Sequence, residues 1–498
     1  MLLTMGFAVV VTLWLWFHAS IMPPNHDSMA LLSAASRMLT GGHYYSEILE
    51  VNPPLILIIL SPVFGVSRVL RTSIEVSVLL WIEALLIASV ILARPQLQRL
   101  FRIDKTESWA LALALLFFLN AIPGDFGERD HLMVAFAIPA ICWFIGRELG
   151  ENNARLPCGV LVVGSLGFLL KPQSLVIPAF LIIAATVRAR SWRRLLDPCV
   201  FGFCFVAAAY AAIILLVFPD YLRVAALAAD LYGYFGKSPH ILVYRVLPML
   251  AVTAFLVVIF ETIEIEPRTR TIARFLAGLA TVGFLTLVLQ GKGFSYHYLP
   301  GIFATMALIG LAASRLTLQW RRKLSLPAVL AMIVALCTPL LSIAGSHLSA
   351  VIYQPRSRIL ALPSYQPAQR LAAGRSFLAM DTTLGPAFPT VTMIGAAWAS
   401  RSPHQWLIPG IVDLEKGDTE EQRLAARYKA AAIDMMVEDL QRYRPDIVAV
   451  NVAPTHEPIS GPFDFLKFYG QDSRFGKLWS DYTLVESIPD WDFYRRVD

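Results

Sequence analysis

A dense group of ionisable residues occupies a short polar segment between two apolar blocks. It contains Asp125, Glu128, Arg129, Asp130 and His131. An arginine guanidinium binds phosphate as a planar fork, and a neighbouring carboxylate orients the bound group or serves as acid or base. Charges at the edge of an apolar segment are costly without a partner, which favours a functional role. A solvated turn with local ion pairs is the alternative.

Isolated cations occur at two further boundaries between apolar blocks. Lys171 separates two short blocks, and Lys292 follows another, beside two glycines and ahead of Tyr296 and His297. Either ammonium could neutralise a phosphate leaving group. Snorkelling lysines next to an interfacial belt of aromatic residues would give the same pattern.

A carboxylate also follows the first apolar block of the chain. Asp27, next to His26, precedes an amphipathic stretch that ends near Leu39. At the level of lipid headgroups, such a carboxylate could take the proton of an acceptor hydroxyl. Alternatively, Asp27 caps the N-terminus of a helix that begins at Ser28.

The elements that position these residues must lie in a membrane. The chain has 498 residues, of which 56% are hydrophobic and 16% are charged, and its mean hydropathy is +0.59. Its apolar residues form blocks close to the roughly 20 residues that cross a bilayer as a helix. Helices satisfy the backbone of such blocks in lipid, which offers no hydrogen-bond partners.

The basic residues define the expected topology. The net charge is +6, but the lysines and arginines form short clusters between apolar blocks, which indicates cytoplasmic loops rather than a nucleic-acid-binding surface. All clusters face one side if residues 53–70, which begin with two prolines, lie at the interface or re-enter instead of crossing. About eleven crossings follow, with the N-terminus inside: 6–22, 72–93, 108–122, 131–146, 156–170, 173–187, 196–218, 243–260, 271–289, 298–314 and 324–345.

From about residue 346 the apolar runs become shorter and are separated by polar and proline-rich turns. Thr419-x-x-Gln422 resembles a capping box that opens a helix, and Pro445 ends this helix before a strand at 446–450. Residues 483–488 and 493–497 are further strand candidates. The sequence thus predicts an all-α polytopic membrane bundle over 1–345 and an outer α/β domain over 346–498.

Several classes of function lack their motifs in this sequence. It has no Walker loop, no GxGxxG after a strand and no GxSxG elbow, and its five cysteines form no CxxC pair or His-spaced zinc pattern. Asp27, Asp125 and Asp130 carry the oxygen ligands that suit a hard divalent cation. No spacing demands such a site, so the sequence predicts no metal ligands and leaves a divalent cation open as a cofactor.

The order of the motifs resembles the GT-C superfamily of glycosyltransferases, which use polyprenyl-phosphate-linked sugars. The resemblance extends to about residue 190 and is nearest to the branch of lipid A aminoarabinose transferases and protein O-mannosyltransferases. It rests on Asp27, on the acidic segment that starts at Asp125, and on two motifs of the first polar loop, Gly41-Gly42-x-Tyr44-Tyr45 and Asn52-Pro53-Pro54-Leu55. The interfacial helix at 53–70 agrees with it.

The resemblance implies transfer of a sugar from polyprenyl phosphate to a cell-envelope acceptor, which would be a glycolipid, a polysaccharide or a protein. The reaction would take place on the outer face of a bacterial inner membrane, by a single displacement with inversion and without ATP. Asp27 matches the catalytic carboxylate of the family, and Asp125, Glu128 or Asp130 matches its second acidic position.

The same resemblance implies roles for the remaining polar residues. The donor phosphate would be bound by Arg129, Lys171, Lys292, Tyr296 and His297. The substrates would be contacted by His26, Tyr44, Tyr45, Asn52 and His131.

Two other classes of protein fit part of the pattern. One is a transporter or flippase of lipid-linked saccharides, which usually has broken helices near mid-membrane in repeated halves, and this sequence shows no repeat. The other is a non-catalytic envelope-assembly protein. Replacing Asp27 with Asn separates an enzyme, which loses turnover but retains donor binding, from a scaffold, which is indifferent.

Overall fold

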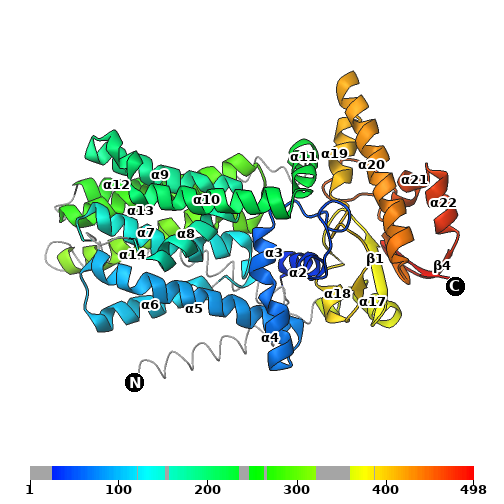
Figure 1. Ribbon diagram of the computed structural model, residues 1–498, viewed down its shortest axis with the longest axis horizontal. Helices are drawn as coiled ribbons and strands as arrows, with labels where there is room; N and C mark the ends of the chain where they lie inside the picture. The colour runs from blue at the N-terminus through cyan, green and yellow to red at the C-terminus, as the bar shows by residue number, and fades with distance from the viewer. Residues whose placement is uncertain are drawn as a thin grey trace. The chain divides into compact units, whose positions relative to one another are not determined.

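The computed structural model describes residues 25–120, 122–151, 156–234, 246–262, 266–320, 359–385 and 387–497. Its chain divides into two compact units (Figure 1). The helical unit contains the described parts of 82–212 and 246–320. The mixed unit contains 25–81, 213–234 and the described part of 359–497. Each unit has its own candidate functional residues.

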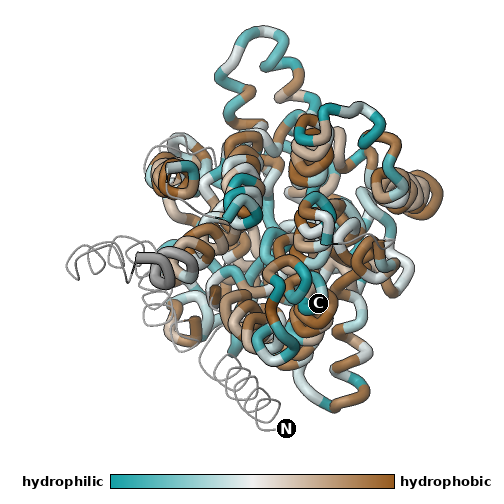
Figure 2. Tube along the Cα trace, turned by 90° about the vertical axis from the view of Figure 1, so that its left-hand side faces the viewer, coloured by the Kyte–Doolittle hydropathy of each residue, from teal (hydrophilic) through white to brown (hydrophobic). Residues whose placement is uncertain are grey.

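The helical unit consists of long apolar helices joined by short polar segments. Its elements, two of which run on into the mixed unit, are α5 (Ile74–Phe101), α6 (Lys105–Asn120), η1 (Pro123–Asp125), α7 (Arg129–Glu148), α8 (Cys158–Leu169), η2 (Pro172–Leu175), α9 (Val176–Ala189), η3 (Trp192–Leu196), α10 (Pro198–Val217), α12 (Leu247–Thr262), α13 (Pro267–Gln290), η6 (Ser295–Tyr298) and α14 (Leu299–Trp320). Figure 2 shows hydrophobic residues along these helices in brown.

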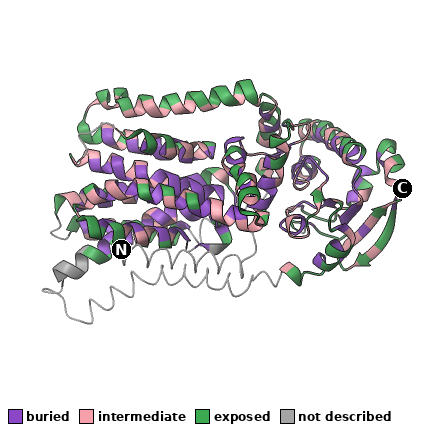
Figure 3. Cartoon of the chain, turned by 60° about the horizontal axis from the view of Figure 1, so that its bottom comes forward, coloured by how far each residue is buried: buried purple, intermediate pink, exposed green. Residues whose placement is uncertain are grey.

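Six helical stretches among the described residues are long and apolar enough to cross a membrane, which fits a multi-pass membrane protein. They are Ile74–Phe101, Arg129–Glu148, Pro172–Ala189, Pro198–Val217, Pro267–Gln290 and Ser295–Ser314. The helix α10 is the clearest case, because it has no buried residue although it is apolar throughout. Figure 3 shows how burial varies among the helices. A wholly exposed apolar helix is stable when lipid covers it.

The expected eleven crossings are not shown. Two of them, 6–22 and 324–345, lie outside the described residues. Three others are shorter helices, namely α6 with 16 residues, α8 with 12 and α12 with 16. The remaining six coincide with the long helices.

Helices α7 and α8 approach closely because α8 carries glycines where they cross. A Cβ atom on Gly164 would lie 2.5 Å from the Cβ of Ala140, and one on Gly167 would lie 2.8 Å from the Cβ of Phe136. Small residues permit such backbone contact between membrane helices. This contact sets where the end of α8, and the Lys171 that follows it, lies beside α7.

The mixed unit combines a small sheet with helices from three parts of the chain. Its elements are α2 (His26–Leu39), α3 (Leu55–Leu60), α4 (Pro62–Leu70), α11 (Tyr221–Leu231), η4 (Tyr232–Tyr234), α17 (Tyr365–Ala372), β1 (Ser376–Met380), α18 (Thr390–Met393), β2 (Ala397–Trp398), α19 (Leu407–Leu414), α20 (Thr419–Tyr443), β3 (Ile447–Asn451), α21 (Phe465–Tyr469), α22 (Ser473–Trp479), β4 (Tyr482–Ile488) and β5 (Trp491–Arg496). The first polar loop therefore belongs to the same compact unit as the C-terminal region.

The strand order of the sheet is β2-β1-β3-β5-β4. Strands β2, β1 and β3 run parallel, and β5 pairs antiparallel with both β3 and β4. In β1 and β3 four successive residues are buried, so both faces of these strands are covered, as is usual for parallel strands. The α/β character and the three expected strands are confirmed, whereas β1 and β2 were not predicted.

The longest helix of the mixed unit, α20, begins one residue earlier than the sequence pattern suggested. Asp418 is the N-cap residue, and its side chain accepts hydrogen bonds from the backbone of Glu420 and Glu421. The Glu421 side chain in turn accepts a hydrogen bond from the Asp418 N–H at 2.9 Å. The expected Thr419–Gln422 box was therefore wrong by one position, because an aspartate is the stronger capping residue.

The expected helix at 53–70 forms as two short helices, α3 and α4, which are separated at Ser61. Pro62 occupies the first turn of α4, where its missing N–H is tolerated. Trp81 donates its indole N–H to the carbonyl of Ile59 at 2.7 Å, which ties this helix pair to the start of α5. The expected domain boundary at 345/346 lies outside the described residues.

Candidate functional site

The polar segment before α7 folds into a buried turn. Asp125, Glu128, Arg129, Asp130 and His131 are all buried. The Gly127 N–H donates to Nδ1 of His131 at 3.0 Å, so this histidine closes the turn and carries its hydrogen on Nε2 when neutral. Asp130 lies in the first turn of α7, where the helix dipole favours a carboxylate. The alternative of a solvated turn is thus wrong, and His131 has a structural contact.

Lys171 reaches this turn from the segment between α8 and η2. Its Nζ forms a buried ion pair with a carboxylate oxygen of Asp130. A buried lysine of this kind is tolerated when a carboxylate compensates its desolvation. The two residues are 41 positions apart in the chain, and the close crossing of α7 and α8 brings them together.

The segment after α13 completes the cluster. Gly291 ends α13 in the left-handed conformation (φ 63°), which turns the chain so that Lys292 follows buried. Ser295 donates its hydroxyl to Oδ1 of Asp125 at 2.7 Å, which joins η6 to η1. We call Asp125, Arg129, Asp130, Lys171, Lys292 and Tyr296 the bundle cluster.

The ring of Tyr296 lies between two cations of the bundle cluster. The Lys171 ammonium is 4.9 Å from the centre of the ring, and the Arg129 guanidinium is 5.9 Å from it. Tyr296 also packs edge-on against His297, with 4.6 Å between the ring centres. Aromatic rings attract cations through their negative faces, so Tyr296 holds both cations in one place.

The cations of the bundle cluster act on one another electrostatically. Burial, together with the nearby charges of Arg129 and Lys171, lowers the pKa of Lys292 to about 6. Burial also lowers the pKa of Lys171, which Asp130 partly opposes. An anion beside Lys292 would offset the repulsion from the other two cations.

The bundle cluster can therefore bind a phosphate group. Arg129 offers a planar fork, and the two lysines offer point charges. Among the residues that the structure describes, no group of three or more His, Cys, Asp or Glu side chains is placed to hold a metal ion. The fold brings the predicted phosphate-binding residues of the helical unit close to one another. The predicted acidic residues lie in the same place.

The predicted residues of the first polar loop lie in the mixed unit. Asn25 is the N-cap of α2, and its side chain accepts from the Ser28 N–H at 2.9 Å. Asp27 therefore does not cap this helix and lies within its first turn, with its carboxylate 3.8 Å from Nε2 of His26. The capping explanation for Asp27 is wrong, because the preceding asparagine provides the cap.

The tyrosines and the asparagine of the first loop make packing contacts. Tyr44 is buried edge-on against Phe218 and Tyr221, with ring centres 6.1 Å and 5.3 Å away. Tyr45 has a left-handed backbone (φ 68°), and the Arg223 guanidinium lies 3.8 Å from its ring centre. These contacts fold the loop on itself and on α11.

Asn52 is held by a carboxylate of the same loop. Its backbone N–H donates to Oε1 of Glu50 at 2.9 Å, and its side-chain amide bonds the same oxygen. Glu50 is buried. This contact sets the conformation of the chain just before the two prolines.

Two arginines that the sequence analysis did not single out fasten this loop to the sheet. Arg37 of α2 donates to the carbonyls of Glu47 at 3.0 Å and Trp398 at 2.6 Å and bonds that of Ser400, while stacking 4.6 Å from the ring centre of Tyr443. Of these partners, Trp398 ends β2, Ser400 follows this strand and Tyr443 ends α20. An arginine within the amphipathic stretch after Asp27 was the sequence signal for this role.

The second arginine, Arg401, belongs to a charge network of Ser400, Arg401, Glu438 and Asp439 that we call the domain cluster, which is buried except at Glu438. Arg401 pairs with Asp439 at 2.7 Å and with Glu438 at 2.7 Å, and Asp439 also accepts the Ser400 hydroxyl at 2.8 Å. The carbonyl of Arg401 accepts the N–H of Leu49 at 2.8 Å. The first polar loop is therefore held from two sides.

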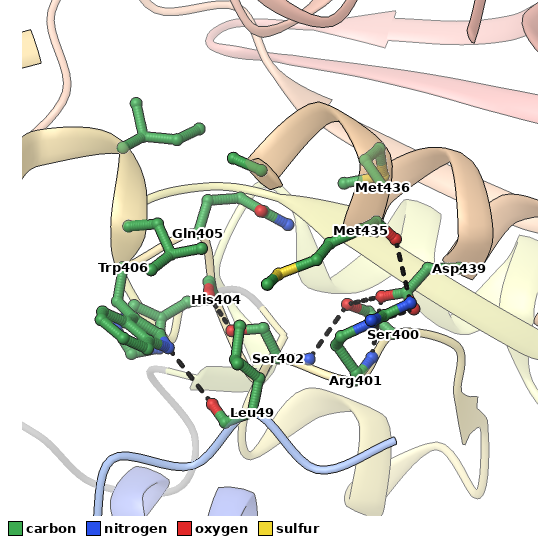
Figure 4. A pocket seen from close by; sticks show the side chains of 13 residues that line it. Leu49, Ser400, Arg401, Ser402, His404, Gln405, Trp406, Met435, Met436 and Asp439 are labelled. Atoms are coloured by element: carbon green, nitrogen blue, oxygen red, sulfur yellow. Dashed lines mark hydrogen bonds and ion pairs between the residues drawn. The ribbon is translucent and has the colours of Figure 1, made fainter. Parts of the chain in front are cut away.

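A small cavity of about 20 Å³ lies beside the domain cluster (Figure 4). Arg401, Gln405, Met435 and Asp439 are among the residues that line it. This volume is close to the minimum that one water molecule requires. The cavity therefore accommodates a solvent molecule rather than a substrate.

Comparisons of the chain with protein-family models, with curated proteins and with solved structures find no match.

Proposed function

We propose that the protein is a membrane glycosyltransferase that takes a sugar from a polyprenyl-phosphate donor. The observation that carries this proposal is the bundle cluster, in which Arg129 and Lys171 lie over the ring of Tyr296 and both act electrostatically on the buried Lys292. Three cations from separate segments of a lipid-exposed helix bundle suit a phosphate on a lipid. A phosphate-linked sugar is already activated, so the reaction needs no nucleotide.

The cations would have two roles in such a reaction. They would hold the donor phosphate before reaction, and they would stabilise the negative charge that grows on it as the bond to the anomeric carbon breaks. The bond that forms joins the acceptor oxygen to the anomeric carbon, and the acceptor proton passes to a base. Asp27, from the mixed unit, remains the predicted base, as in the family that the sequence resembles.

Binding of lipid phosphate to the purified protein in nanodiscs tests the first part. Undecaprenyl phosphate should bind Arg129→Gln and Lys171→Gln about 10- to 100-fold more weakly than the wild type, since each charge-assisted hydrogen bond contributes roughly 1.5–3 kcal/mol. Lys105→Gln is the matched control, because Lys105 is exposed at the start of α6. Unchanged binding by the two cluster variants would refute the phosphate site.

Turnover separates the enzyme from the transporter and from the assembly protein. With donor and acceptor supplied as a membrane extract, Asp27→Asn should stop the release of undecaprenyl phosphate and leave donor binding intact. A transporter or a scaffold would retain its function in this variant. Retention of sugar transfer by Asp27→Asn would exclude Asp27 as the base.

A further inference from the structure

A buried polar pair joins α5 and α6 inside the helical unit. Glu83 is 2% exposed and Asn120 is 4% exposed. The Asn120 side-chain amide donates to Oε1 of Glu83 at 3.3 Å and to the carbonyl of Leu116 at 3.0 Å. Oε2 of Glu83 and Oδ1 of Asn120 are also buried, and neither has a hydrogen-bond partner among the described residues. The pair therefore presents two acceptor oxygens that call for a donor.

The position of the pair along α5 follows from a contact between α5 and α7. These helices run parallel, because α6 returns the chain between them. Ser89 of α5 donates its hydroxyl to the carbonyl of Ala135 in α7. Glu83 and Arg129 each lie six residues before this contact, which is about 9 Å toward the N-terminus of their helices. The carboxylate thus lies at the level of the bundle cluster.

A second contact gives the position of Asn120 along the bundle. Phe118 of α6 packs against Phe303 of α14, with 4.8 Å between the ring centres. The two helices run in opposite directions. Asn120, near the end of α6, and His297, just before α14, therefore lie on the same side of this contact, toward η1 and η6. At the rise of a helix, Asn120 lies about 3 Å and His297 about 9 Å from the contact along the helix axes. Asn120 is therefore about one helical turn below the cluster.

The chemistry of the pair differs from that of the cations of the bundle cluster. A carboxylate and a carbonyl oxygen repel phosphate, and they accept hydrogen bonds from hydroxyl groups. A ligand that binds both the cations and the Glu83–Asn120 pair needs an anionic group and, about one helical turn away, hydroxyl groups. A sugar phosphate has both. An ionisable residue buried at this depth in a membrane helix is also rarely without function.

We propose that Glu83 and Asn120 accept hydrogen bonds from hydroxyl groups of the donor's sugar, within about one helical turn, along the bundle, of the cations that hold its phosphate. This inference rests on the proposed function, because it assigns the sugar end of the same ligand. The competing explanation is structural: a protonated Glu83 that donates to Asn120 would close the pair on itself. That explanation predicts an effect on stability alone.

Paired ligands of equal charge test the proposal. The probes are undecaprenyl methyl phosphate and undecaprenyl phosphates that carry glucose, mannose or N-acetylglucosamine, all phosphodiesters, bound to the protein in nanodiscs. The wild type should bind at least one sugar-bearing lipid about 10- to 100-fold more tightly than the methyl ester, as hydrogen bonds to a charged acceptor allow. Glu83→Gln and Asn120→Ala should reduce this preference to near unity while leaving affinity for the methyl ester unchanged.

The matched control is Gln96→Leu, which removes a buried polar side chain of α5 about 20 Å further along the helix. It should retain the preference for sugar whatever its melting temperature. Equal binding of all probes by the wild type, or a preference that survives in Glu83→Gln, would overturn the inference. Lys171→Gln serves a separate purpose, because unchanged binding of every probe by this variant would instead overturn the phosphate site.

Discussion

The two units each bury a cluster of charged side chains, and the clusters differ in how their charges are balanced. In the domain cluster Arg401 is matched by Asp439 and Glu438, and its pKa is raised because these carboxylates outweigh the effect of burial. In the bundle cluster the pKa of Lys292 is lowered by burial and by two further cations. Carboxylates that pair with a buried arginine stabilise a fold, whereas repulsion between neighbouring cations is relieved when an anion binds beside them.

The two clusters also differ in what they connect. The domain cluster joins the segment after β2 to α20 and accepts the backbone of the first polar loop through Leu49. The bundle cluster joins the segments before α7, after α8 and after α13 through the ring of Tyr296. One network thus holds a loop in place, and the other gathers groups that can act on a ligand.

The largest expected effect is on stability, in the domain cluster. Arg401→Met leaves Asp439 buried without its cation and should lower the free energy of unfolding by about 3–5 kcal/mol. The measurement is chemical unfolding of the detergent-solubilised protein, with hydrogen exchange to locate the change at α20 and Tyr45–Leu49. Arg423→Met, an exposed position on α20, is the control. A stable Arg401→Met variant would mean that the domain cluster is not structural.

The bundle cluster should respond in the opposite way. Lys292→Met removes a buried cation that two others oppose, so the melting temperature should stay the same or rise. Affinity for undecaprenyl phosphate should nevertheless fall about 10- to 100-fold. Lys171→Met should lose both stability and affinity, since it leaves Asp130 buried without its partner. A destabilised Lys292→Met variant with normal affinity would erase the contrast between the clusters.

The smallest expected effect is the dependence of binding on pH. With a pKa of about 6, Lys292 is mainly charged below this pH and mainly neutral above it. A phosphodiester prefers the charged form, so affinity for undecaprenyl methyl phosphate should fall about tenfold between pH 5 and pH 7. A phosphodiester does not itself titrate in this range. Lys292→Met should show a flat profile, and an unchanged slope in this variant would assign the titration to another group.

Local properties of the sequence determined the membrane character, the α/β nature of the C-terminal region and the polar segments that carry the cations. Hydropathy and charge are read over some twenty neighbouring residues, so the positions of apolar helices and of their charged ends follow directly. Arg129, Lys171 and Lys292 were predicted for this reason. Thr419 was misassigned as a cap and the alternative that Asp27 caps α2 is wrong, because neighbouring residues compete for the same backbone groups.

Contacts between distant parts of the chain were decided by tertiary structure alone. Lys171 meets Asp130 because glycines let α8 approach α7, and Arg401 meets Asp439 because β2 ends beside α20. Glu83 lies within an apolar block of the sequence, and only the packing of α5 against α6 identifies Asn120 as its hydrogen-bond partner. A buried polar group is stabilised by whichever partner packing brings near, and no local pattern in the sequence encodes that choice.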